Sequence, residues 1–158
     1  MARVASKPNI AQEVCGMVGK VVGYHAEIPE GLYTVKYCGY ETGKSWNSQK
    51  VTVKFAVVEG EYAGVPLARY YNVRRLYEPI GPNGDFDVGD RSYLVKEFRS
   101  LFPDIRSTSE IDLDLYRSKS IRVKVVTTNK TGTGEELTGP NQYSVIRKLI
   151  EIIPETYE

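Results

Sequence analysis

The feature that most constrains the fold is the stretch from Lys50 to Val73, which the sequence marks as two strands joined by a short turn. Apolar residues alternate with Lys, Thr and Ala over residues 50–57, the period-two pattern of a half-buried strand. Two glycines within residues 59–64 supply the positive φ angles that a tight reversal needs, and an extended pattern resumes over residues 65–73. The pattern predicts a core hairpin, with inward side chains at Val51, Val53, Phe55, Val57, Leu67, Tyr71 and Val73.

The charge pattern predicts a basic side and an acidic side. The segment from Lys44 to Arg75 contains six basic and two acidic residues, a net charge of +4. The segment from Leu76 to Leu115 contains nine acidic and four basic residues, a net charge of −5. The whole chain carries only +1, which argues against a nucleic-acid binder that depends on electrostatics alone. A strand surface that mixes basic and aromatic residues nevertheless suits polyanions with flat bases.

Composition favours one mainly β domain. The chain has 158 residues, twelve tyrosines and fourteen glycines, and β-branched and aromatic residues suit a pleated surface. Residues 1–28 are expected to form an N-terminal arm or an extra strand, and residues 29–158 the main domain. Cys15 and Cys38 have no metal-site spacing and are expected to be free thiols. Without an apolar leader or span, we expect a cytoplasmic protein that has no membrane segment, metal or cofactor, and whose oligomeric state stays open.

Outside the hairpin, the pattern predicts a first strand over residues 32–40 and a polar loop with the only tryptophan, Trp46. This tryptophan is either a stacking residue or an anchor of the core. A Pro/Gly/Asp loop follows the hairpin over residues 76–89, and Asp90 is expected to cap a helix with an apolar stripe that ends before Pro103.

The pattern of the C-terminal part predicts two further strands. Residues 121–126 alternate, and a polar, glycine-containing loop follows them. Residues 143–153 fit a helical stripe and a bulged strand equally well. We choose the strand, because the preceding strand otherwise has no hairpin partner.

This order, three strands, a helix and two strands, is that of the OB-fold, a five-stranded, partly open Greek-key barrel. In that fold strands 2 and 3, with the loops after strands 1 and 4, bind oligonucleotides or oligosaccharides. The expected fold is therefore an OB-fold-like barrel with one helix between strands 3 and 4. The candidate nucleic-acid-binding residues are Lys44, Trp46, Lys50, Lys54, Arg69, Tyr70, Arg74, Arg75 and Lys130.

Four segments of the chain resemble small phage and mobile-element proteins regarded as OB domains that bind single-stranded DNA. They are residues 28–35, 55–64, 71–73 and 116–125. The resemblance implies a single-stranded-DNA-binding protein of a phage or mobile element, with a role in DNA replication or recombination. Binding is expected to depend little on sequence, because the basic residues would meet phosphates and not base edges.

Two other functions compete with this one. An OB-type module could dock on a host or replication protein through its acidic side, and tyrosine-rich surfaces serve protein partners equally well. An enzyme is not expected, because His25 is the only histidine and no nucleophile motif stands beside it.

Overall fold

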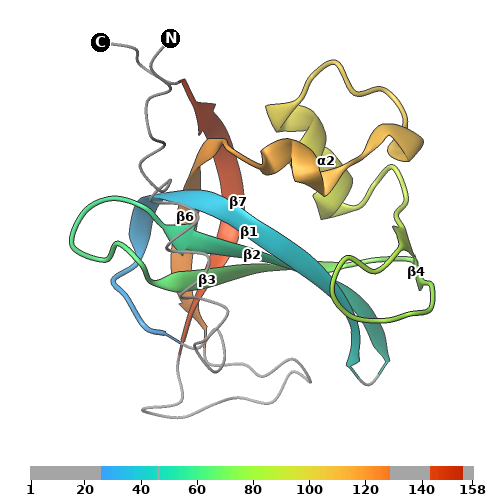
Figure 1. The fold of residues 1–158 in the computed structure, drawn as a ribbon, viewed down its shortest axis with the longest axis horizontal. Helices are drawn as coiled ribbons and strands as arrows, with labels where there is room; N and C mark the ends of the chain where they lie inside the picture. Colours follow the sequence, from blue (N-terminus) through green and yellow to red (C-terminus); the bar gives the residue numbers. More distant parts are fainter. Residues whose placement is uncertain (1–25, 46, 129–142, 155–158) are drawn as a thin grey trace, which may run out of the picture.

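The computed structural model describes residues 26–45, 47–128 and 143–154. Five long strands form one antiparallel sheet in the order β3-β2-β1-β6-β7, and among the described residues one α-helix packs against β3 and β7 (Figure 1). The elements are β1 (Gly31–Ser45), β2 (Ser48–Val57), β3 (Pro66–Asn72), α2 (Tyr93–Leu101), β6 (Ser120–Thr128) and β7 (Tyr143–Ile153). The mainly β class is thus confirmed.

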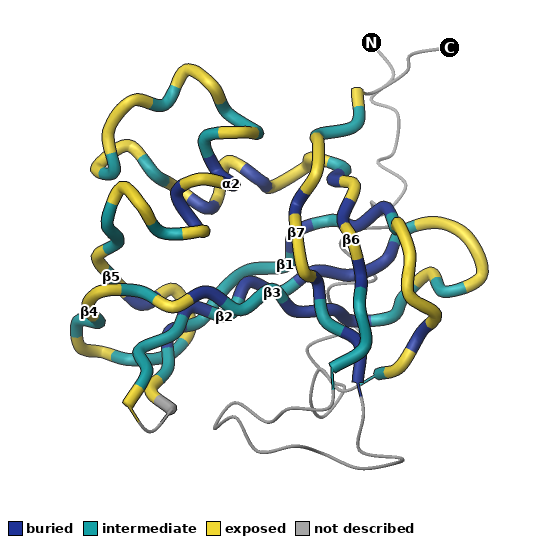
Figure 2. The backbone as a smooth tube through the Cα atoms, turned by 180° about the vertical axis from the view of Figure 1, so that it is seen from behind, coloured by how far each residue is buried: buried dark blue, intermediate teal, exposed yellow. Residues whose placement is uncertain are grey.

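The expected hairpin is present as β2 and β3. Phe55 lies opposite Leu67, and both side chains are fully buried. The turn between the strands uses positive φ angles at Gly60 (81°) and Gly64 (94°), which residues with a Cβ rarely adopt. The inward positions of β2 are all fully buried, which confirms the alternation predicted for Val51, Val53, Phe55 and Val57. Figure 2 shows this buried stretch along β2.

The ambiguous C-terminal segment is a strand, β7, which pairs with β6. Its register shifts twice, once beside Val123 and once between Lys124 and Val125. The second shift lets Ile146 and Leu149, three residues apart, both point into the core. The bulge therefore explains why the apolar spacing of this strand imitated a helix.

Helix α2 forms where expected but begins at a different cap. The side chain of Ser92, and not that of Asp90, accepts the hydrogen bond from the backbone N–H of Val95. Asp90 instead forms an ion pair with Arg99. Phe98 carries the helix onto the core, with its ring centroid 5.4 Å from that of Tyr116.

The loop after β3 contains a second, two-stranded sheet that the sequence did not predict. It consists of β4 (Arg75–Leu76) and β5 (Phe86–Asp87). This loop lies beside the far end of the β1–β2 hairpin (Figure 1), where Thr42 N–H donates to Gly81 O at 2.9 Å. Two short 3₁₀ turns, η1 (Thr108–Glu110) and η2 (Leu113–Tyr116), connect α2 to β6.

The two outer strands of the sheet, β3 and β7, touch each other. Among the described residues, however, the sheet has no ladder of backbone hydrogen bonds between them. The sheet with one helix between the hairpin and β6 is as predicted, while a closed barrel is not shown.

Cys38 and Ile28 differ from what the sequence predicted. Cys38 is disulfide-bonded, so the expectation of a free thiol is wrong for this residue, and Cys15 lies outside the described residues. Ile28 is buried, and its backbone N–H donates to Ser144 Oγ at 2.8 Å. Ile28 is therefore joined to the sheet at the start of β7.

Candidate nucleic-acid interface

The outer face of β2 and β3 brings together three of the predicted residues. Residues directly opposite each other in an antiparallel pair point to the same side of the sheet. Lys50 lies opposite Asn72, and Thr52 lies opposite Tyr70. Lys50, Lys54 and Tyr70 therefore share the face opposite to the core.

Lys54 already has an acidic neighbour on this face. Its Nζ lies 3.1 Å from Oε2 of Glu41, and both side chains are partly exposed. Glu41 belongs to β1, where it lies opposite Thr52. Because an exposed pair of this kind contributes only about 0–1 kcal/mol, a phosphate could displace the carboxylate at low cost.

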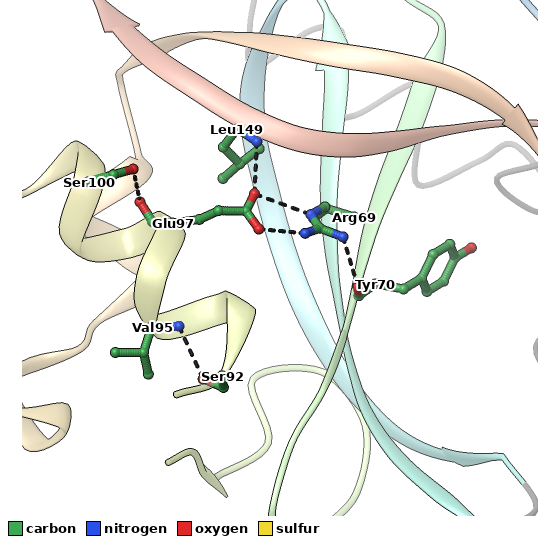
Figure 3. A network of polar contacts seen from close by, with 7 residues as sticks. All are labelled: Arg69, Tyr70, Ser92, Val95, Glu97, Ser100 and Leu149. Atoms are coloured by element: carbon green, nitrogen blue, oxygen red, sulfur yellow. Dashed lines mark hydrogen bonds and ion pairs between the residues drawn. The ribbon is translucent and has the colours of Figure 1, made fainter. Parts of the chain in front are cut away.

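Tyr70 is a half-buried aromatic residue at the edge of this face. Burial raises its pKa to about 12, and the charges of Tyr143 and Glu41 act in the same direction. The phenol is therefore neutral at physiological pH. Its ring points away from the neighbouring polar network (Figure 3), so it faces the outer side of β3.

Arg69 lies on the opposite face of β3, because strand alternation places it across from the inward residue Val53. Its guanidinium forms an ion pair with Glu97 of α2, and only 15% of its side chain is exposed. Burial lowers the pKa of Arg69, but the hydrogen bond to Glu97 and neighbouring charges outweigh this effect and raise it. Arg69 thus has a structural partner and does not belong to the outer face with Lys50.

Glu97 joins three elements at this point, as Figure 3 shows. Its Oε1 accepts hydrogen bonds from Leu149 N–H of β7 at 2.8 Å and from Arg69 Nε of β3 at 3.3 Å. Its Oε2 accepts a further bond from Arg69 Nη2. One helical carboxylate therefore bridges the outer strands, β3 and β7.

Arg74 and Arg75 follow β3 and are exposed, but they lie beside acidic residues. The Arg75 guanidinium lies 4.8 Å from the ring centroid of Tyr77. Arg74 lines a pocket of about 880 Å³ whose lining includes Glu78, Asp85 and Asp87. The predicted basic and acidic sides thus meet at β4 and β5.

Of the remaining predicted residues, Lys44 is exposed near the end of the β1–β2 hairpin. Trp46 and Lys130 lie outside the described residues. The structure therefore brings Lys50, Lys54 and Tyr70 together.

A group of basic residues that the sequence did not suggest lies between α2, β6 and β7. They line a pocket of about 670 Å³ together with Arg69, Tyr93, Glu97 and Ser100. The group consists of Lys96, Lys124, Arg147 and Lys148. Its members come from three elements, so no local motif contains them. The alternation of β6, with Arg122 and Lys124 between buried residues, was the one usable signal.

In the described part of the chain, no helix is long and apolar enough to cross a membrane. No family model, curated protein or solved structure matches this chain. The resemblance to phage proteins therefore stays a prediction.

Proposed function

We propose that this protein binds single-stranded DNA through the outer face of β2 and β3, as an OB-type domain. The strand order carries the proposal. In a five-stranded Greek-key barrel of this type, strand 1 pairs with strands 2 and 4, and strands 3 and 5 meet. The order β3-β2-β1-β6-β7, with β3 and β7 in contact and a helix between β3 and β6, agrees with that arrangement.

The chemistry of the face supports the same proposal. Lys50 and Lys54 would neutralise phosphates, and Tyr70 would offer a ring to a base. In an OB domain the segments after β1 and β6 flank this surface, and these contain Trp46 and Lys130. Contacts of this kind engage phosphates and base faces, so binding should depend little on sequence.

The first experiment measures the binding of labelled oligo(dT) as a function of salt. Lys50→Gln should lower the log–log salt slope by about 0.7, the value for one phosphate contact on a single strand. Arg106→Gln is the matched control, since Arg106 is exposed and outside the proposed face. Absence of oligo(dT) binding by the wild-type protein at low salt would refute the proposal.

Trp46 gives a second test of the same proposal. Stacking on a base is worth about 1–3 kcal/mol by alanine substitution, so Trp46→Ala should weaken oligonucleotide binding about tenfold while Tm stays unchanged. If Trp46 instead anchors the core, the substitution lowers Tm and leaves the affinity of the folded protein as it was. Both quantities should be measured on the same variant.

The pocket beside β4 and β5 favours an alternative, a module that binds a basic segment of another protein. Its acidic residues are accompanied by Tyr40, Tyr77 and Phe86, a mixture suited to Arg side chains. An oligo-arginine peptide is the probe for this function. Binding that is lost in Asp85→Asn and retained in Glu59→Gln, which changes an exposed residue outside this pocket, would favour it over DNA binding.

A further inference from the structure

The basic pocket between α2, β6 and β7 carries an excess of positive charge. Five basic side chains line it, and Glu97 is the one acidic residue of the lining. The Glu97 carboxylate is occupied by Arg69 and by the N–H of Leu149. The positive charges of Lys96, Lys124, Arg147 and Lys148 therefore remain uncompensated by the lining.

These four residues also lack acidic partners elsewhere in the described residues. Salt bridges there involve other cations, such as Arg99 with Asp90 and Arg122 with Glu151. Lys124 and Lys148 are moreover directly opposite each other on β6 and β7. Like charges in such a position destabilise a strand pair, and a bound anion would relieve that cost.

A bulge concentrates the charge further. The register pairs Lys124 with Lys148 and Val125 with Ile146, which leaves Arg147 as the extra residue. Two consecutive residues of β7, Arg147 and Lys148, are consequently exposed. The pocket thus receives cations from the bulge and from the facing strand, while Lys96 adds one from the helix.

The pocket also has an aromatic residue at its edge. Tyr93 is 73% exposed, an unusual position for such a large ring. The Nζ of Lys96 lies 5.5 Å from the centroid of the Tyr93 ring. Proteins that bind single-stranded nucleic acids combine exposed aromatic rings with basic side chains. A base stacks on the ring, and the phosphates lie against the cations.

A second, smaller hollow shares lining residues with this pocket and includes Tyr70 of the proposed DNA-binding face. It measures about 410 Å³ and is lined by Tyr70 and by residues of β6 and β7. Arg69 and Arg147 line both hollows. A chain that leaves Tyr70 can therefore follow the junction of β3 and β7 to Lys148 and Tyr93.

We infer that the junction of β3 and β7 is a second phosphate-binding segment, along which a single strand continues from Tyr70 into the basic pocket beside α2. The inference rests on the proposed function. It adds a site on the helix side of the sheet, and it names the phosphodiester backbone as the ligand. A short oligonucleotide fills the β2–β3 face alone, and a longer one reaches the pocket.

The test uses oligo(dT) of 4 and 16 nucleotides, about the limits of what one OB domain covers. The variant Lys96→Gln/Lys124→Gln/Lys148→Gln removes three cations without touching the Arg69–Glu97 pair. Its salt slope with the longer oligonucleotide should fall by about 2, while the shorter one binds as to the wild type. The matched control, Arg91→Gln/Arg106→Gln/Lys119→Gln, removes as much charge from exposed positions outside the pocket. Lys148→Gln alone, with a slope change of about 0.7, replaces the triple variant if that variant does not fold.

The outcomes separate the two proposals. If the wild type binds both lengths and the pocket variant behaves as the control does, the inference is refuted and the proposed function stands. If the pocket variant loses affinity for both lengths equally, the pocket is not a continuation of the site and the inference is again refuted. If the wild type binds neither length, the proposed function itself fails, and the inference fails with it.

Discussion

Strand β3 has two neighbours, and it is joined to them in different ways. On one side it forms a regular ladder with β2, from Lys50 opposite Asn72 to Ala56 opposite Pro66. On the other side it touches β7, and no ladder of backbone hydrogen bonds joins the two strands among the described residues. The Glu97 carboxylate bridges them instead. One junction is held by backbone hydrogen bonds over a buried apolar face. The other is held through α2, where the Glu97 carboxylate pairs with the largely buried Arg69 of β3 and accepts a hydrogen bond from Leu149 of β7.

The two kinds of junction differ in what they tolerate. An apolar face is stabilised by the area it buries, so its contributions are spread over many residues. A buried ion pair barely repays the cost of removing both charges from water, but losing one partner leaves the other charge buried and alone. Substitutions at the β2–β3 junction should therefore destabilise the protein according to the side-chain volume they remove. Substitutions at the β3–β7 junction should do so according to the charge they remove.

The largest effect is expected at the β2–β3 junction. Phe55→Ala removes a fully buried ring opposite Leu67, and such a change costs about 3–5 kcal/mol in the free energy of unfolding. Leu32→Ala on neighbouring β1 is the control, because Leu32 is 60% exposed and should change stability by no more than about 0.5 kcal/mol. Urea denaturation of both variants measures the difference. Equal costs would contradict the assignment of Phe55 to the core.

At the β3–β7 junction the expected cost depends on the replacement. Glu97→Ala leaves the largely buried Arg69 without its acidic partner, and breaking a fully buried pair costs about 3–5 kcal/mol, which sets the upper limit here. Glu97→Gln is nearly isosteric and keeps an acceptor for the N–H of Leu149, so it should cost less than Glu97→Ala.

The control for both Glu97 variants is Asp90→Ala. Asp90 pairs with Arg99 at the surface, where an ion pair contributes only about 0–1 kcal/mol. If Glu97→Ala is no more destabilising than Asp90→Ala, then the ion pair does not hold β3 and β7 together.

The same contrast explains what could be predicted from the sequence. The hairpin, α2 and β6 follow from local alternation or helical spacing, which burial of Phe55 and Phe98 bears out. Arg69 is expected among the outward DNA contacts because basic residues are interleaved with Tyr70 and Asn72 along the hairpin, but its side chain turns inward to Glu97 of α2, 28 residues later. The period-two pattern that places Leu67 and Tyr71 inward also places Arg69 on that face, so the direction of its side chain could have been predicted. Its partner Glu97 could not, because a contact at that distance is set by tertiary packing.

The basic pocket escaped prediction for a related reason. Lys124 and Lys148 become neighbours only through the pairing of β6 with β7, and Arg147 joins them only through a bulge. The N-cap was a smaller error, because Asp90 and Ser92 are both good capping residues and only the backbone geometry distinguishes them.

Alkaline pH should destabilise the protein through the tyrosines that are buried beside Glu97. Burial raises the pKa of Tyr71 and Tyr116 above 10, and the charge of Glu97 adds to the effect. In the unfolded chain these phenols ionise near pH 10, so their stabilisation is complete below pH 10 and is lost as pH rises above it. Each such tyrosine should lower the free energy of unfolding by about 1.4 kcal/mol per pH unit.

Denaturation at several pH values between 8 and 11 measures this slope. Tyr116→Phe removes one of the titrating groups, and should reduce the slope above pH 10 by the contribution of one proton. Leu32→Ala is the control, since Leu32 is exposed and its removal deletes no titratable group. A slope that is the same in the wild type and in Tyr116→Phe would show that Tyr116 does not stay protonated in the folded protein.

The smallest effect on stability is expected for the exposed pair of Lys54 and Glu41, which is the surface counterpart of Arg69 and Glu97. Glu41→Gln removes a partly exposed carboxylate 3.1 Å from Lys54, so the free energy of unfolding should change by no more than about 1 kcal/mol.

Glu41→Gln should increase the affinity for DNA. If the outer face binds DNA as proposed, the substitution removes the carboxylate that Lys54 now contacts, and with it a charge that repels phosphates. Affinity for oligo(dT) should then rise by up to about fivefold, which corresponds to about 1 kcal/mol. Glu59→Gln is the matched control, because Glu59 is exposed in the turn after β2 and belongs to no salt bridge among the described residues. A decrease in affinity, or an equal rise in both variants, would mean that Lys54 does not meet the ligand through the site it now shares with Glu41.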